Sequence, residues 1–367
     1  MKKLISLISL TSLLVFNVNT SSASTSFPTI DEASTTTHTL GNGTTNTVTS
    51  TGSVTTSNSL SEIITMGTNS ILTNDGTITN TSTNDSAKVI LAGEGSKIIN
   101  NGDIIGFGAT DGIIVIDEDN VQITNTGNII SRNGQSGIQV VDFGTGLSIT
   151  NSGTILIENG SVGDEAIDLE SFSEDINATV TNTGSIIVRG SATKAILGGG
   201  GAQNITLGNN SIVIGSIDLG ANNDVLTISG NNSSLTGAVD LGIGDDIMTI
   251  SGNNSTITGN IDLGAGDDTL TISGSNSVII GTVDLGAGTD SVAVGGSNFG
   301  KSSRLAVQNA ETLTLDSSTP GVRIGTSKVY TIDPTGFTAM TMAANNLSKT
   351  VSDQVNSRLS LTDNESS

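Results

Sequence analysis

The chain has 367 residues, a formal net charge of −22 at pH 7 and no cysteine. Its negative charge makes nucleic acid and anionic lipid poor partners, because both carry the same sign. Charged residues are only 13% of the chain, and 46 residues are glycine. This composition argues against a disordered polyanion and an ordinary globular enzyme. Its many β-branched and turn-forming residues favour a repetitive all-β fold instead.

Residues 1–23 have the three parts of a secretory signal peptide. Lys2 and Lys3 form a short basic start, residues 4–16 are mostly apolar, and Ala23 ends a run of small residues suited to cleavage. The apolar stretch is too short for a transmembrane anchor, and no other stretch reaches ~18 apolar residues. An exported chain without cysteine points to a bacterial protein with a large self-stacking fold.

Residues 24–58 are rich in Thr and Ser and have only a weak pattern, so we expect a leader or a cap there. Further along, an Asn-x-Gly motif flanked by β-branched residues recurs. Its glycines are spaced 26, 25, 26 and 31 residues apart, at Gly76, Gly102, Gly127, Gly153 and Gly184. Each interval predicts one coil of a β-helix, with loops inserted where the interval is longer.

Residues 208–295 divide without gaps into four units of 22 residues. Within a unit the apolar residues alternate as in a strand: Ile217 and Leu219 share one face, and Asp218 takes the other. Two glycine columns mark corners where a positive φ is useful: Gly215, Gly237, Gly259 and Gly281, and Gly220, Gly242, Gly264 and Gly286. A further column predicts an Asn ladder at another corner: Asn232, Asn254, Asn276 and Asn298.

A unit of this length accommodates three short strands and tight corners. It predicts an all-β, right-handed parallel β-helix over residues 59–307. Coils of such a fold lie about 4.8 Å apart, so about a dozen of them form a rod of roughly 50–60 Å with a continuous aliphatic core. Residues 308–332 then follow as junction strands.

Residues 333–360 have a helical period. Larger apolar residues recur at steps of three or four from Phe337 to Leu359, as on one face of an amphipathic helix. Pro334 and Thr335 suit its first turn. We expect a linker helix of about 36 Å here, which either crosses a membrane-thickness structure or caps the β-helix. Residues 361–367 form a short tail.

The order of these segments resembles that of an autotransporter, the type V secretion family of Gram-negative bacteria. A signal peptide precedes the coils, and the stretches NAETLTLD (309–316) and YTIDPTGF (330–337) lead into the amphipathic helix. The resemblance covers nearly the whole mature chain. It implies a passenger domain that reaches the cell surface, the outer membrane or the medium after export through the inner membrane.

The resemblance also implies an outer-membrane β-barrel translocator. Such a barrel needs many amphipathic strands and girdles of aromatic residues. Only eight residues follow Leu359, and the chain has one Tyr and seven Phe. We therefore expect the translocator barrel to lie outside this sequence.

Acidic residues recur at one corner of the 22-residue units. The stretch LGAGDDTLT (263–271) resembles the nonapeptide of calcium-binding β-rolls, but a roll needs this motif every nine residues and is therefore excluded. A single column of stacked carboxylates remains a candidate calcium site, because a cation would relieve a repulsion of about 1 kcal/mol per pair in water. The alternative is outward-pointing carboxylates that serve only the turn. The candidate ligands are Asp224, Asp246, Asp268 and Asp290, with Asp245 and Asp267 beside two of them. No other cofactor is expected.

Signatures of catalysis are poor. A second acidic column is expected to face solvent: Asp218, Asp240, Asp262 and Asp284. The only histidine, His38, lies in the leader, so no Ser-His-Asp triad is available on the rod. Neighbouring acids such as Asp245 and Asp246 would diverge on a strand rather than flank a glycosidic bond. We therefore do not expect an enzyme.

The sequence thus predicts an adhesin-like passenger that presents a β-helix rod to host cells, matrix or other bacteria. Adhesion is implied by the resemblance and by the poor catalytic signatures. The flat strand faces and the loops around residues 111–120, 160–175 and 190–201 are the candidate contact surfaces. Two alternatives stay open: a secreted, calcium-stabilised structural protein, and a polysaccharide-active β-helix enzyme that would use Asp246 and Asp268.

Overall fold

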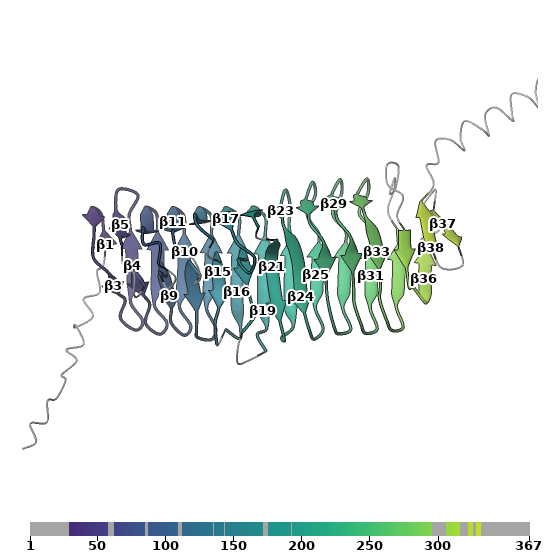
Figure 1. Cartoon of the computed structure of the whole chain (residues 1–367), viewed down its shortest axis with the longest axis horizontal. Coiled ribbons are helices and arrows are strands. Elements are labelled where there is room, and N and C mark those ends of the chain that lie inside the picture. The colour runs from purple at the N-terminus through teal and green to yellow at the C-terminus, as the bar shows by residue number, and fades with distance from the viewer. Residues whose placement is uncertain are drawn as a thin grey trace, which may run out of the picture.

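The protein is a rod of stacked β-coils (Figure 1). The computed structural model describes residues 29–57, 62–84, 87–108, 112–134, 136–142, 144–171, 175–191, 193–295, 306–315, 322–325 and 328–331. These residues form 38 strands, and none of them lies in a helix that could cross a membrane. The expected signal peptide, linker helix and C-terminal tail lie outside the described residues.

The strands form three sheets, here called A, B and C, and successive strands of the chain pass from one sheet to the next. Sheet A contains β1 (Thr29–Ile30), β4 (Thr45–Val48), β7 (Ile71–Asn74), β10 (Lys97–Asn100), β13 (Gln122–Asn125), β16 (Leu147–Asn151), β19 (Ala178–Asn182), β22 (Gln203–Leu207), β25 (Val225–Ile228), β28 (Ile247–Ile250), β31 (Thr269–Ile272), β34 (Ser291–Val294) and β36 (Thr312–Leu315). Sheet B contains β2 (Ala33–Ser34), β5 (Ser53–Thr56), β8 (Thr77–Asn80), β11 (Asp103–Gly106), β14 (Asn128–Ser131), β17 (Thr154–Gly160), β20 (Ser185–Gly190), β23 (Ile212–Ile214), β26 (Ser234–Thr236), β29 (Thr256–Thr258) and β32 (Val278–Ile280). Sheet C contains β3 (His38–Thr39), β6 (Ile64–Thr65), β9 (Ile90–Ala92), β12 (Ile114–Ile116), β15 (Ile138–Val140), β18 (Ile167–Asp168), β21 (Lys194–Gly199), β24 (Ser216–Gly220), β27 (Val239–Asp240), β30 (Ile261–Asp262), β33 (Thr282–Asp284), β35 (Ala306–Gln308), β38 (Lys328–Thr331) and β37 (Val322–Gly325).

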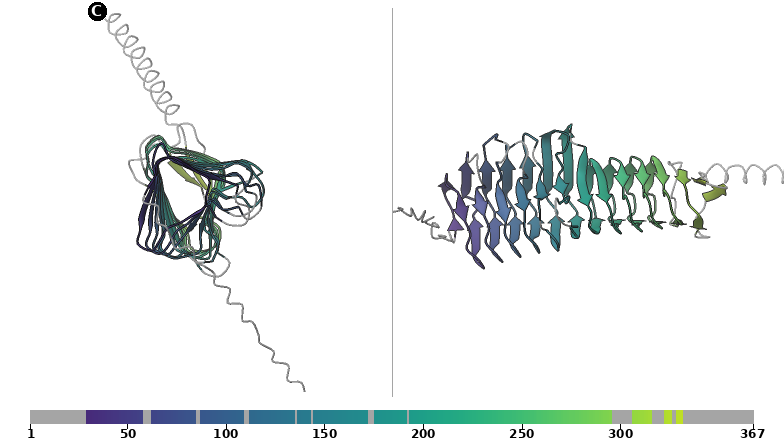
Figure 2. Two further views of the ribbon diagram at one scale, coloured as in Figure 1. Left: turned by 90° about the vertical axis from the view of Figure 1, so that its left-hand side faces the viewer. Right: turned by 60° about the horizontal axis from the view of Figure 1, so that its bottom comes forward.

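The parallel β-helix predicted from the repeats is confirmed. Seen end on, the coils overlay in a three-sided outline around a common interior (Figure 2). Sheets A and B pair their neighbouring strands in parallel, as in β25 with β28 and β26 with β29. Sheet C does the same until its C-terminal end, where β37 and β38 pair antiparallel as a hairpin on β35.

The coils begin earlier than residue 59. Strands β1 to β5 lie in the segment expected as a leader or cap, and β4 and β5 pair in parallel with β7 and β8 of the next coil. Their sequences, TNTV and SVTT, are mostly polar, but Val48 and Val54 are fully buried. Because one inward aliphatic side chain per strand suffices here, the hydrophobic pattern of this segment is weak.

Side-chain alternation builds the core. In β25, Leu226 and Ile228 are buried while Val225 and Thr227 lie outside, as the two-residue period of a strand requires. Parallel pairing then stacks like on like, for example Leu226 on Met248. Each fully buried aliphatic side chain of such a column contributes about 1.5–3 kcal/mol.

The Asn of each Asn-x-Gly motif forms a buried ladder at the corner between sheets A and B. Each side-chain amide donates through Nδ2 to the Oδ1 atom of the Asn one coil further on, at 2.7 Å in all four steps. These steps are 26, 25, 26 and 31 residues long, so the predicted coil intervals are confirmed. The Asn ladder, as we name it, comprises Asn74, Asn100, Asn125, Asn151 and Asn182.

The second Asn ladder predicted for the 22-residue units lies one residue away from the expected column. Asn232, Asn254 and Asn276 have φ of 56–58°, the left-handed conformation that Asn tolerates at turns. The side chains that bridge the coils belong to the preceding residues: the amide N–H groups of Asn231 and Asn253 donate to Oδ1 of Asn209 and Asn231 at 2.8 and 2.9 Å. Position within the turn thus decides which Asn bonds to the next coil.

Candidate functional site

The candidate calcium column lies inside the corner between sheets C and A. Asp224 and Asp246 directly precede β25 and β28, and both side chains are 0% exposed. Asp268 and Asp290 occupy the same place one and two coils further on and are 1% and 0% exposed. The interpretation of these carboxylates as outward-pointing groups is therefore wrong. We call Asp224, Asp246, Asp268 and Asp290 the Asp ladder.

Backbone hydrogen bonds hold each rung of the Asp ladder. The amide N–H groups of Asp224, Asp246 and Asp268 donate to Oδ1 of the next rung at 2.7, 2.8 and 2.8 Å. At one end Gln203 N–H donates to Asp224 Oδ1 at 2.6 Å, and at the other Asp290 N–H donates to Glu311 Oε2 at 2.8 Å. One carboxylate oxygen per rung is thereby used to tie two coils together.

The second carboxylate oxygen has no such role. Oδ2 of all four rungs is buried and has no hydrogen-bond partner among the described residues. Two ionised rungs about 4.8 Å apart would repel by about 3–4 kcal/mol at an effective dielectric constant of ~20. This repulsion and the burial both favour the protonated, neutral form of each rung.

The pKa values follow from this burial. Loss of hydration raises the pKa of Asp224 to about 8, and the charge of Asp246 adds to the rise. Burial likewise raises the pKa values of Asp246 and Asp268 to about 6, with further increases from neighbouring carboxylates. The pKa of Asp290 is raised by burial as well. The N–H groups bound to Oδ1 act in the opposite direction but do not compensate.

The residues fit a calcium site poorly. Within the described ranges, no three acidic or histidine side chains gather closely enough to hold a metal ion. Each rung has one free oxygen per coil, whereas Ca²⁺ takes six to eight oxygen ligands. Asp245 and Asp267 are exposed, and their Oδ1 atoms accept N–H groups of Asp267 and Thr289 at 2.9 and 2.8 Å. The geometry therefore does not identify these six residues as metal ligands, and calcium binding here stays a prediction.

The second acidic column lies on the outer face of sheet C, as predicted. Asp240 and Asp262 are exposed, and Asp218 and Asp284 are partly exposed. Lys194 on the neighbouring strand β21 forms an ion pair with Asp218, with 2.7 Å between Nζ and Oδ2. This ion pair marks the N-terminal end of an acidic stripe on sheet C.

A third acidic group was not predicted from the sequence. Asp164, Glu165 and Asp168, which are 6–8% exposed, surround the start of β18. Burial and the nearby charge of Asp168 raise the pKa of Glu165 to about 7, and burial raises that of Asp168 to about 6. Gln139 Nε2 donates to Asp168 Oδ2 at 3.3 Å. The one signal in the sequence is three acids within five residues in the longest coil interval.

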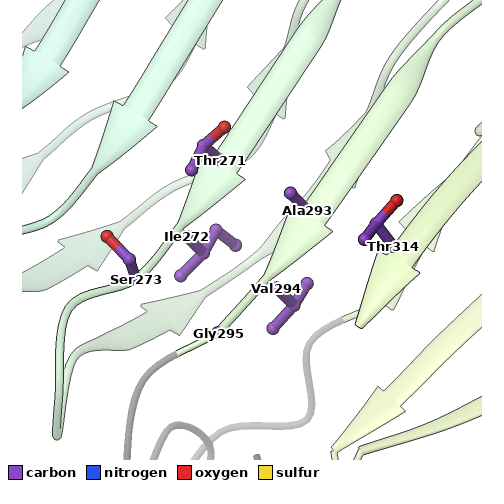
Figure 3. A pocket seen from close by; sticks show the side chains of 7 residues that line it. All are labelled: Thr271, Ile272, Ser273, Ala293, Val294, Gly295 and Thr314. Carbon is purple, nitrogen blue, oxygen red and sulfur yellow. The ribbon is translucent and has the colours of Figure 1, made fainter. Parts of the chain in front are cut away.

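An apolar hollow of about 250 Å³ lies near the C-terminal end of sheet A. Figure 3 shows its lining, to which β31, β34 and β36 contribute Ile272, Val294 and Thr314 among others. Its described lining residues include no charged side chain, and one of them, Gly295, is the last residue described before position 306. The side chains of its described lining are aliphatic or carry a hydroxyl group.

Fold and sites together define a three-sided parallel β-solenoid with buried Asn and Asp ladders. Comparison of the chain with protein-family models, with curated proteins and with solved structures finds no match in any of the three.

Proposed function

We propose that the chain is an adhesin-like passenger of the autotransporter type, which presents its rod to host cells, matrix or other bacteria. The observation that carries the proposal is the rod itself, with sheets of 13, 11 and 14 strands and outward positions that recur in every coil. A solenoid of this kind offers extended faces on which many weak contacts add up.

The face best suited to contact is the outer face of sheet A. One outward column of this sheet has Thr at eleven of thirteen positions, and the other two are Ile99 and Ala293. Lys97 is the one charged side chain at the outward positions of the described sheet A strands. A polar, nearly uncharged face avoids the repulsion that the acidic stripe on sheet C would meet at an anionic cell surface. The Thr column, as we name it, comprises Thr29, Thr47, Thr73, Thr124, Thr150, Thr181, Thr206, Thr227, Thr249, Thr271 and Thr314.

Adherence of beads coated with the full chain tests the proposal. We expect coated beads to bind epithelial cells, matrix proteins or bacteria above the level of uncoated beads. The variant T150K/T181K/T206K should lose most of this binding, because it places three charges on the sheet A face. A matched control, T236K/T258K/I280K, places three charges at exposed positions of sheet B and should retain it. Binding of coated beads at the uncoated level on all three surfaces would refute the proposal.

Several parts of the proposal rest on the sequence alone. They are the export signal at 1–23, the right-handed winding, the linker helix at 333–360, the location at the cell surface and a translocator barrel outside this sequence. The alternative as a polysaccharide-active enzyme is not favoured, because Asp246 and Asp268 are buried inside the corner. A substrate cannot reach them without opening the coils.

The calcium-stabilised alternative has a simple test. Binding to the folded rod would raise its melting temperature in proportion to the logarithm of the ion concentration. Melting of the full chain in millimolar Ca²⁺ should then occur several degrees higher than in EDTA. Equal melting temperatures in the two solutions would count against a calcium column at Asp224, Asp246, Asp268 and Asp290.

A further inference from the structure

We propose that the Asp ladder is a proton-binding device, whose buried carboxyls carry protons in the folded rod in mildly acidic medium, so that the C-terminal coils are stabilised by acid and loosen as the medium becomes alkaline. The inference concerns stability and does not depend on the proposed adhesive function. It rests first on the position of Asp224, Asp246, Asp268 and Asp290, each at most 1% exposed and each with a buried Oδ2 that lacks a partner among the described residues.

Among the described residues, no cationic side chain is paired with the ladder. Residues 208–295 contain ten Asp and no Lys, Arg, His or Glu. Within the part of the chain that the structure describes, the charged groups that shift the pKa of a rung are all acidic. They include the neighbouring rungs of the ladder. Asp240 and Asp245 also act on Asp246, and Asp245 and Asp267 also act on Asp268. The groups that act on Asp290 are Asp267, Asp284 and Glu311. Since a buried carboxylate without a counter-ion is costly, protonation removes the charge without any ligand beyond the rung itself.

The earlier coils show that this corner does not need a charge. In the preceding coils its position is occupied by Leu147, Ala178 and Gln203, which are all neutral. Gln203 still donates its backbone N–H to Asp224. A neutral rung is therefore compatible with the stacking, and a proton on Oδ2 leaves the N–H bond to Oδ1 in place. In the described coils, an acidic residue occupies this corner position only from Asp224 onward.

The sign of the pH effect follows from the pKa values. They are raised above the value of about 3.9 for an unfolded Asp. The stabilisation is therefore fully present below about pH 4 and is lost as the pH rises through about 6 for Asp246 and Asp268 and about 8 for Asp224. For each proton that the folded ladder holds and the unfolded chain releases, the unfolding constant rises about tenfold per pH unit.

Thermal unfolding of the full chain between about pH 5 and pH 9 tests the proposal. The melting temperature of the wild type should fall across this range. The ladder variant D224N/D246N/D268N should lose most of this fall, because Asn is neutral and of similar size. The surface variant D240N/D262N/D284N removes the same number of charges from sheet C and should keep it. Variant E165Q/D168N shows how much of the fall in melting temperature comes from Glu165 and Asp168, whose pKa values also lie in this range.

A melting temperature that is constant or rises between pH 5 and 9 would overturn the proposal, and so would equal effects of the ladder and surface variants. If the ladder variant does not fold, carboxyl carbon NMR of the wild type decides. Resonances of protonated Asp side chains at about pH 5.5 are the expected result. Titration of all Asp carboxyls with midpoints near 4 would show that the ladder is ionised in the folded protein.

Discussion

Gly264→Ala is expected to destabilise the rod by about 3–5 kcal/mol. Gly264 has φ +99°, and a Cβ there would overlap the carbonyl oxygen of Gly242 one coil away. Left-handed strain and steric overlap each cost about 1–3 kcal/mol, and backbone atoms cannot rotate away as a side chain can. Denaturant unfolding of the full chain measures the loss.

Gly43 provides the matched control for this substitution. Its φ is +66°, but a Cβ there meets nothing within 4 Å. Gly43→Ala therefore carries only the conformational strain, and we expect a loss of about 1 kcal/mol. Equal losses at Gly43 and Gly264 would show that the coils at the Gly264 corner are far enough apart to accept a Cβ.

Asn125→Ala is expected to cost about 3–5 kcal/mol, because Asn125 is the central rung of the Asn ladder. Its Nδ2 donates to Asn151 Oδ1 at 2.7 Å and to the Thr154 carbonyl at 3.2 Å, and its Oδ1 accepts from Asn100 at 2.7 Å. Alanine leaves a cavity and unpaired polar atoms inside the corner. The loss is measured as the free energy of unfolding.

Asn101→Ala is the matched control for the ladder. Asn101 is exposed; its Nδ2 donates to Asp75 Oδ1 and its Oδ1 accepts from Thr126 Oγ1, both on the surface. Water can replace these two bonds, so we expect a loss below about 1 kcal/mol. A loss at Asn125 no larger than that at Asn101 would mean that the buried Asn ladder does not hold the coils in register.

The repeats predicted the architecture because each coil has a similar pattern of apolar, Gly and Asn residues. The spacing of the Asn-x-Gly motifs equals the spacing of the Asn ladder, and the apolar alternation around Leu226 correctly places the core. Burial of the Asp ladder was missed although the same alternation indicates it. Asp224 lies two residues before Leu226 and thus on the inward face, but its charge suggested exposure.

Other features could not be predicted from local pattern. The acidic group at Asp164, Glu165 and Asp168 depends on contacts with Ser136, Gln139 and Lys194, which lie in neighbouring coils. Insertions of irregular length separate these residues in sequence, so no period brings them together. The early start of the rod at Thr29 was missed because Thr and Ser occupy most outward and turn positions there.

Two internal deletions test whether the coil is the unit of the fold. Deletion of residues 252–273 removes one 22-residue unit and joins Ser251 to Gly274, which keeps every column in register. Deletion of residues 252–262 removes half a unit and joins Ser251 to Leu263, which moves inward side chains to wrong positions. We predict that thermal unfolding, followed by β-sheet circular dichroism, remains cooperative in the first variant and is lost in the second. Equal behaviour of the two variants, whether both fold or both fail, would show that the coil is not the unit of the fold.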